Sequence, residues 1–163
     1  MHKPTAEPVN GQAYIELRRG HILEALERRP RQLSDAMLSP ARMAFLRREA
    51  EALYWNELAW EELTDDEIVH GGHLTEMVFP GLLAFVDGLV SEGNSRPPHL
   101  EVVESILAFL GDRYGTLSAE LEAGADSRKL VWARAMTARL VDLVLHRLLG
   151  LSAAEREELE AAS

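Results

Sequence analysis

The residues best suited to chemistry lie in the middle of the chain. His73 and Glu76 are three residues apart, so on a helix they share one face. Glu49 and Glu57 precede them on a separate predicted helix. Bundle proteins that bind metals gather Glu, Asp and His from facing helices. If the two helices pack antiparallel, these four side chains form a candidate site for a divalent metal, with ligand types that suit Zn, Fe or Mn.

The same segment also has a simpler interpretation, in which it only begins and ends helices. Thr64 and Glu67 have the spacing of a capping box, and Gly71-Gly72 would end the short helix that this box opens. His73 would then lie at a solvated helix entry. Glu76 would be favoured in that first turn by the helix dipole. Both interpretations remain open at this stage.

Other catalytic and cofactor motifs are absent from the sequence. The chain has no cysteine, which excludes disulfides, thiolate metal sites and cysteine nucleophiles. It also lacks a glycine-rich dinucleotide fingerprint, a phosphate-binding loop and a nucleophile elbow. We therefore nominate no catalytic residue and no required cofactor, and we expect a protein without intrinsic catalysis.

Composition limits the protein's partners and compartment. The chain has 163 residues, a hydrophobic fraction of 47% and a formal net charge of −10. This size and apolar content suit one domain with a proper core. The negative charge predicts that the protein binds neither nucleic acid nor an anionic membrane. The absence of a signal-like N-terminus, of a spanning segment and of cysteine favours a cytoplasmic protein.

Helical periodicity and helix-breaking residues divide the chain into elements. The pattern predicts an all-α, single-domain bundle over residues 11–163, preceded by an extended N-terminal arm over residues 1–10. About five main helices and two or three short ones are expected. The main helices are predicted over residues 11–29, 39–63, 73–91, 98–114 and 126–149, and the short ones over residues 64–71, 116–123 and 152–161.

Projection of the helix over residues 39–63 gives an unusual distribution of side chains. Its apolar arc includes Phe45, with Glu49, Asn56 and Glu57 inside that arc or at its margin. Trp55 and Leu58 fall on the charged side instead. Large apolar side chains surrounded by charge are favoured as interface anchors. We therefore predict that Trp55 and Leu58 contact a second copy of the chain or another protein.

Two further helices are interpreted from their polar stripes. Residues 73–91 are apolar except for one stripe that includes Ala84, Asp87 and Ser91, so we expect this helix to be central in the core. On the helix over residues 126–149, Arg139, Asp142 and His146 form a stripe that we interpret as a solvated edge, with Asp142 and His146 paired.

These patterns lead to one main functional hypothesis and two alternatives. The main hypothesis is a cytoplasmic interaction or regulatory protein that self-associates through an exposed aromatic helix surface. The first alternative is a helical-bundle metalloprotein or metal-dependent hydrolase that uses Glu49, Glu57, His73 and Glu76. The second is a small-molecule-binding bundle, and the residues proposed to line its apolar pocket are Trp60, Met77, Phe85 and Trp132.

Overall fold

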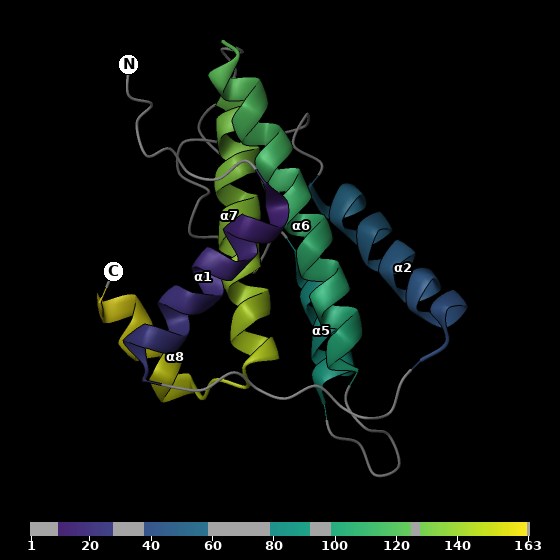
Figure 1. The fold of residues 1–163 in the computed structure, drawn as a ribbon, viewed down its shortest axis with the longest axis vertical. Helices are drawn as coiled ribbons and strands as arrows, with labels where there is room; N and C mark the ends of the chain where they lie inside the picture. The colour runs from purple at the N-terminus through teal and green to yellow at the C-terminus, as the bar shows by residue number, and fades with distance from the viewer. Residues whose placement is uncertain (1–9, 28–37, 59–78, 92–98, 125–127, 163) are drawn as a thin grey trace.

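The described part of the protein is an all-α bundle (Figure 1). The computed structural model describes residues 10–27, 38–58, 79–91, 99–124 and 128–162. These residues form six helices and no strand, which confirms the predicted fold class. The helices are α1 (Gly11–Ala25), α2 (Pro40–Leu58), α5 (Pro80–Val90), α6 (Leu100–Glu122), α7 (Arg128–Leu148) and α8 (Ala153–Ala162).

The centre of the bundle is the antiparallel pair α6 and α7 (Figure 1). Each of these helices buries eleven residues, and together they contact α1, α2 and α5. The expectation that residues 73–91 supply the central helix is therefore wrong. Within that range the described helix α5 has eleven residues, and its exposed stripe is the predicted one of Ala84, Asp87 and Ser91. Helix α5 buries only four residues and therefore contributes less to the core than α6 or α7.

Helix α6 is longer than the sequence pattern predicts. The separate helices expected over residues 98–114 and 116–123 are one continuous helix that passes through Gly115. Gly115 is buried, as are Tyr114 and Leu117 beside it. Burial of these neighbours stabilises the helix by more than the roughly 1 kcal/mol that a helical glycine costs, so the predicted break does not form.

Helix α1 crosses α6 at very short range. A Cβ atom added to Gly111 would lie 2.5 Å from the Gly11 carbonyl oxygen and 2.9 Å from Ile15 Cγ1. Glycine is therefore needed where the two backbones meet. Just beyond this point the rings of Tyr14 and Tyr114 stack with centroids 3.9 Å apart. The crossing fixes the N-terminal half of α1 on α6.

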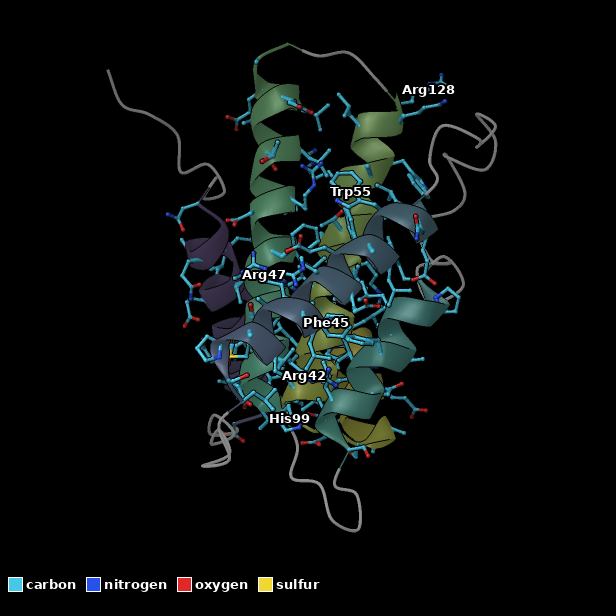
Figure 2. The ribbon with its side chains drawn as sticks, turned by 90° about the vertical axis from the view of Figure 1, so that its right-hand side faces the viewer. Arg42, Phe45, Arg47, Trp55, His99 and Arg128 are labelled. Carbon is cyan, nitrogen blue, oxygen red and sulfur yellow. The ribbon has the colours of Figure 1, made fainter. Side chains whose placement is uncertain are left out.

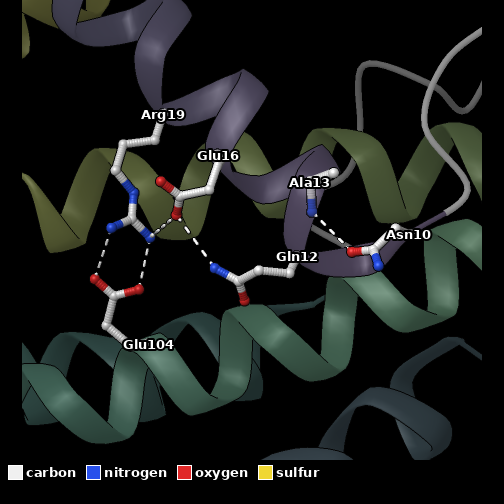
Figure 3. Close-up of polar contacts among 6 residues, drawn as sticks. All are labelled: Asn10, Gln12, Ala13, Glu16, Arg19 and Glu104. Atoms are coloured by element: carbon white, nitrogen blue, oxygen red, sulfur yellow. Dashed lines mark hydrogen bonds and ion pairs between the residues drawn. The ribbon is translucent and has the colours of Figure 1, made fainter.

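Two adjacent arginines then connect α1 to both central helices. Arg19 binds Glu104 on α6 through two hydrogen bonds of 2.9 and 2.6 Å (Figure 3). Arg18 binds Asp142 on α7 in the same bidentate way, at 2.9 and 2.8 Å. Bidentate guanidinium–carboxylate pairs fix orientation as well as distance. They hold α1 against both members of the central pair.

Several helix ends form where the sequence predicts them. Asn10 caps α1 by accepting a hydrogen bond from the Ala13 amide, and Ser39 does the same for the Arg42 amide at the start of α2. Ser152 and Glu155 form the reciprocal bonds of a capping box at α8. Gly150, with φ of 66°, follows the end of α7. Helix α1 ends at Ala25, four residues before the predicted end at residue 29.

Within the described ranges, no helix combines the length and the apolar character needed to cross a bilayer. Apart from Asn10, the predicted N-terminal arm lies outside the described residues, as does the short helix predicted over residues 64–71.

Candidate functional sites

Glu57, a proposed metal ligand, caps a helix. Its two carboxylate oxygens accept hydrogen bonds from the backbone amides of Gly81 (2.6 Å) and Leu82 (2.8 Å). These amides lie in the first turn of α5 and have no partner within that helix. A Cβ atom at residue 81 would lie 2.7 Å from Glu57 Oε2, so glycine leaves room for the carboxylate. Glu57 therefore joins the last turn of α2 to the first turn of α5.

The other proposed metal ligands are not brought to Glu57 by the described structure. Glu49 is exposed on α2, whereas His73 and Glu76 lie outside the described residues. Among the residues that the structure places, no group of three or more His, Asp or Glu could hold a metal ion. The metal hypothesis thus has no assembled site among these residues.

Helix α2 buries a stripe that only partly overlaps the apolar arc predicted from the helical wheel; Leu46 and Ala50 belong to both. Its buried residues are Leu46, Ala50, Tyr54 and Leu58, which follow one another at steps of four. Leu58 is only 3% exposed, so its predicted place on the charged side is wrong. Phe45 was placed in the apolar arc and is 43% exposed. The true stripe winds along the helix, because four residues turn slightly more than one full turn.

The tyrosine of this buried stripe also anchors α2 on α7. Tyr54 is fully buried, and its hydroxyl lies 2.9 Å from Thr137 Oγ1. The Thr137 hydroxyl donates to the Ala133 carbonyl, so Tyr54 donates to Thr137. The tyrosine ring also lies near Phe79 and Phe109. This contact fixes the rotation of α2 and thereby decides which residues face outward.

The side of α2 opposite the core carries two exposed aromatic rings (Figure 2). Trp55 is 48% exposed, as its predicted position on the charged side implies, and Phe45 lies near the other end of the helix. The guanidinium of Arg113 lies 4.5 Å from the Trp55 ring centroid, and that of Arg42 lies 5.3 Å from the Phe45 ring centroid. The outer face of α2 consists of Ala41, Phe45, Arg48, Ala52 and Trp55, all exposed.

A second candidate site is a cavity of about 200 Å³ between α1, α7 and α8. Both charged or polar side chains and apolar ones form its wall. Its lining residues are Arg18, His21, Ile22, Ala25, Arg139, Asp142, His146, Leu159 and Glu160. Two of these lining residues, Arg139 on α7 and Glu160 on α8, form an ion pair at 2.5 Å. The cavity therefore combines charged and apolar walls, is partly enclosed and is built from three helices.

His146 is the most deeply buried polar group of this cavity. It is 4% exposed, and its Nδ1 has no hydrogen-bond partner among the described residues. Burial lowers the pKa of His146 below 6.5. The charges of Arg139 and Arg156 lower this pKa further, while those of Asp142 and Glu160 oppose the shift. The side chain is therefore neutral near pH 7.

The sequence pattern misassigned this cavity. Arg139, Asp142 and His146 were interpreted as a solvated edge, but His146 is buried and Asp142 binds Arg18. Arg18 precedes Asp142 by 124 residues, so no local spacing reveals the contact. The only local signal was that three polar residues share one stripe of a broadly apolar helix.

The apolar pocket predicted for a small molecule is not assembled by the described residues. Trp132 is buried in the core and Phe85 packs against that core. Neither residue lines the cavity between α1, α7 and α8. Trp60 and Met77 lie outside the described residues.

Comparison with known proteins adds no relative: no family model, no curated protein and no solved structure matches this chain.

Proposed function

We propose that this protein is a non-catalytic interaction protein that self-associates through the outer face of α2. The observation that carries the proposal is the exposure of Phe45 and Trp55 on the side of α2 that faces away from the core. Large aromatic side chains that are half-exposed on an otherwise ordinary helix are typical interface anchors.

The spacing of the outer face suits another helix as the occupant. Its five residues follow one another at steps of four, three, four and three, the repeat of a helix–helix seam. Ala41 and Ala52 are small and allow a partner helix to approach. The single charged residue in the seam, Arg48, would select one register at some cost in stability.

A second copy of α2 is the partner that this face fits best. Phe45 and Trp55 are ten residues apart, or about 15 Å along the helix axis. A two-fold axis at the level of residue 50 would place Phe45 of each copy against Trp55 of the other. Such self-complementary contacts are the usual form of a homodimer.

Local charge supports the same partner. The whole chain has a net charge of −10, which opposes association between copies. Helix α2 itself is balanced, with arginines at 42, 47 and 48 and glutamates at 49, 51 and 57. Two copies that meet at α2 therefore bring together segments that carry no net charge. The seam is short, so we expect a weak dimer with a Kd on the order of micromolar or above.

Sedimentation velocity across about 10 μM to about 1 mM protein tests the proposal, because this range brackets the expected Kd. The wild-type protein should shift from monomer to dimer with concentration, whereas Phe45→Glu and Trp55→Gln should remain monomeric. Leu17→Glu and Val131→Glu are the matched controls, since these side chains are 52% and 50% exposed but lie on α1 and α7. A wild-type monomer throughout the range would contradict the proposal, as would dissociation by the control substitutions.

A further inference from the structure

We propose that the cavity between α1, α7 and α8 binds a small organic carboxylate with a compact apolar body. The site is separate from the outer face of α2, and the proposal does not depend on self-association. Its volume of about 200 Å³ exceeds the space of several water molecules, each of which takes about 30 Å³ in the liquid. A molecule the size of a single substituted ring fits such a space.

The free hydrogen-bonding capacity around the cavity favours an anion. Both oxygens of Asp142 already accept hydrogen bonds from Arg18. Arg139 uses one terminal nitrogen on Glu160, although a guanidinium carries five N–H donors. The surroundings therefore have donors to spare, while the Asp142 carboxylate is already satisfied.

His146 adds a second and independent reason to expect a ligand. Only 4% of the residue is exposed to solvent, and its Nδ1 has no hydrogen-bond partner within the described ranges. A buried polar group without a hydrogen-bond partner costs about 1–3 kcal/mol of stability, so such groups are rare in folded proteins. A neutral imidazole supplies one N–H, which a carboxylate oxygen can accept.

The apolar part of the cavity wall determines which chemical group the carboxylate of the ligand carries. Ile22 and Ala25 on α1 and Leu159 on α8 give the cavity an apolar side. A hydrocarbon body packed there is removed from water, while Arg139 and His146 hold the carboxylate end. Sites with mostly fixed polar groups on one side and apolar side chains on the other orient small ligands in this way. Inorganic phosphate or free acetate would leave the apolar side empty.

Benzoate is a suitable probe, with benzylamine and benzyl alcohol as probes of similar size that carry the opposite charge or none. Isothermal titration calorimetry on the full chain should show binding of benzoate and no binding of the other two. Nitrogen-15 NMR of the imidazole groups should show the His146 resonance shifting with benzoate saturation, while that of His99, which does not line the cavity, stays unchanged.

Substitutions then separate this site from general anion binding. Arg139→Gln removes a donor at a side chain that is 36% exposed, so the fold should survive, and benzoate affinity should fall at least about tenfold, equivalent to 1.4 kcal/mol. Ala25→Phe should block binding by filling the apolar side without removing a charge. Arg48→Gln on α2 is the control and should bind benzoate as the wild type does.

Three results would overturn the proposal. They are equal affinity for benzoate and benzylamine, an unshifted His146 resonance at saturating benzoate, and unchanged affinity in both cavity variants. Failure of this proposal is distinguishable from failure of self-association, because Phe45→Glu should leave benzoate binding intact.

Discussion

The carboxylate of Glu57 at the end of α2 binds the backbone amide of Gly81 at the start of α5, at 2.6 Å. With the second bond to the Leu82 amide, it supplies the N-terminal cap that Phe79, the residue before α5, does not provide. A negative charge at this end also interacts favourably with the helix dipole. One side chain thus joins two helices that are separated in sequence by residues 59–79.

Removing this cap should destabilise the protein. We expect Glu57→Ala to lower the free energy of unfolding by about 1–2 kcal/mol, since it loses the two amide bonds and the charge at the helix end. Urea denaturation measures the change. Glu49→Ala on the same helix is the control: its side chain is exposed, and the effect should stay within about 0.5 kcal/mol. Equal losses in the two variants would argue against the capping role.

The crossing of α1 and α6 predicts opposite effects for two glycine substitutions. Gly111→Ala should destabilise by about 1–3 kcal/mol, because the new Cβ would meet the backbone of Gly11, which cannot move aside. Gly88→Ala should stabilise by about 0.5–1 kcal/mol, because Gly88 is inside α5 with nothing within 4 Å. Thermal unfolding of both variants tests the pair. Stabilisation by Gly111→Ala would show that the two helices are farther apart.

The buried hydroxyl pair of Tyr54 and Thr137 predicts an asymmetry. Tyr54→Phe removes a donor and leaves Thr137 still bonded to the Ala133 carbonyl, so the cost should be about 1 kcal/mol. Thr137→Val leaves the Tyr54 hydroxyl buried without an acceptor and should cost about 1–3 kcal/mol. Adding Tyr54→Phe to Thr137→Val should recover part of that loss. A larger cost for Tyr54→Phe than for Thr137→Val would reverse the assigned donor.

Burial of His146 predicts a pH dependence of stability. The pKa of His146 is lowered in the fold, so below pH 6.5 the unfolded chain takes up a proton that the folded chain does not. The contribution to stability is therefore complete above pH 6.5, falls as the pH drops toward the lowered pKa, and then levels off. His146→Gln removes this term while the other histidines remain. The fall in melting temperature from pH 7.5 to pH 5 should be smaller in the variant than in the wild type; equal falls would contradict the assignment.

The sequence pattern predicted several helix starts well, but it predicted some helix ends and the helix faces less well. Asn10, Ser39 and Ser152 cap helices because their side chains reach amides only two or three residues away. Such contacts need no knowledge of the rest of the fold. The faces of α2 were harder: a ranking of residues by polarity cannot tell that Leu58 is buried while Phe45 is exposed.

In the candidate sites too, some features could be predicted from the sequence and others required the tertiary structure. Trp55 stands out in the sequence because it lies among charged residues, and it is exposed in the structure. His146 and Asp142 share a face by their spacing of four, which the sequence shows. The sequence does not show that Arg18 binds Asp142 or that His146 is buried, because both depend on the packing of α1 and α8 against α7.

By itself, then, the sequence determined the all-α class, several helix starts and the acidic character of this protein, because each of these depends on composition or on contacts within one helical turn. Only the tertiary structure decided that α6 and α7 form the centre, that Glu57 caps α5, and that His146 lies in a cavity. These features depend on which helices that are distant in sequence pack against one another. The packing follows from the total area that whole helix faces bury and from the close approach that single residues such as Gly111 allow. Neither can be read from a local sequence pattern.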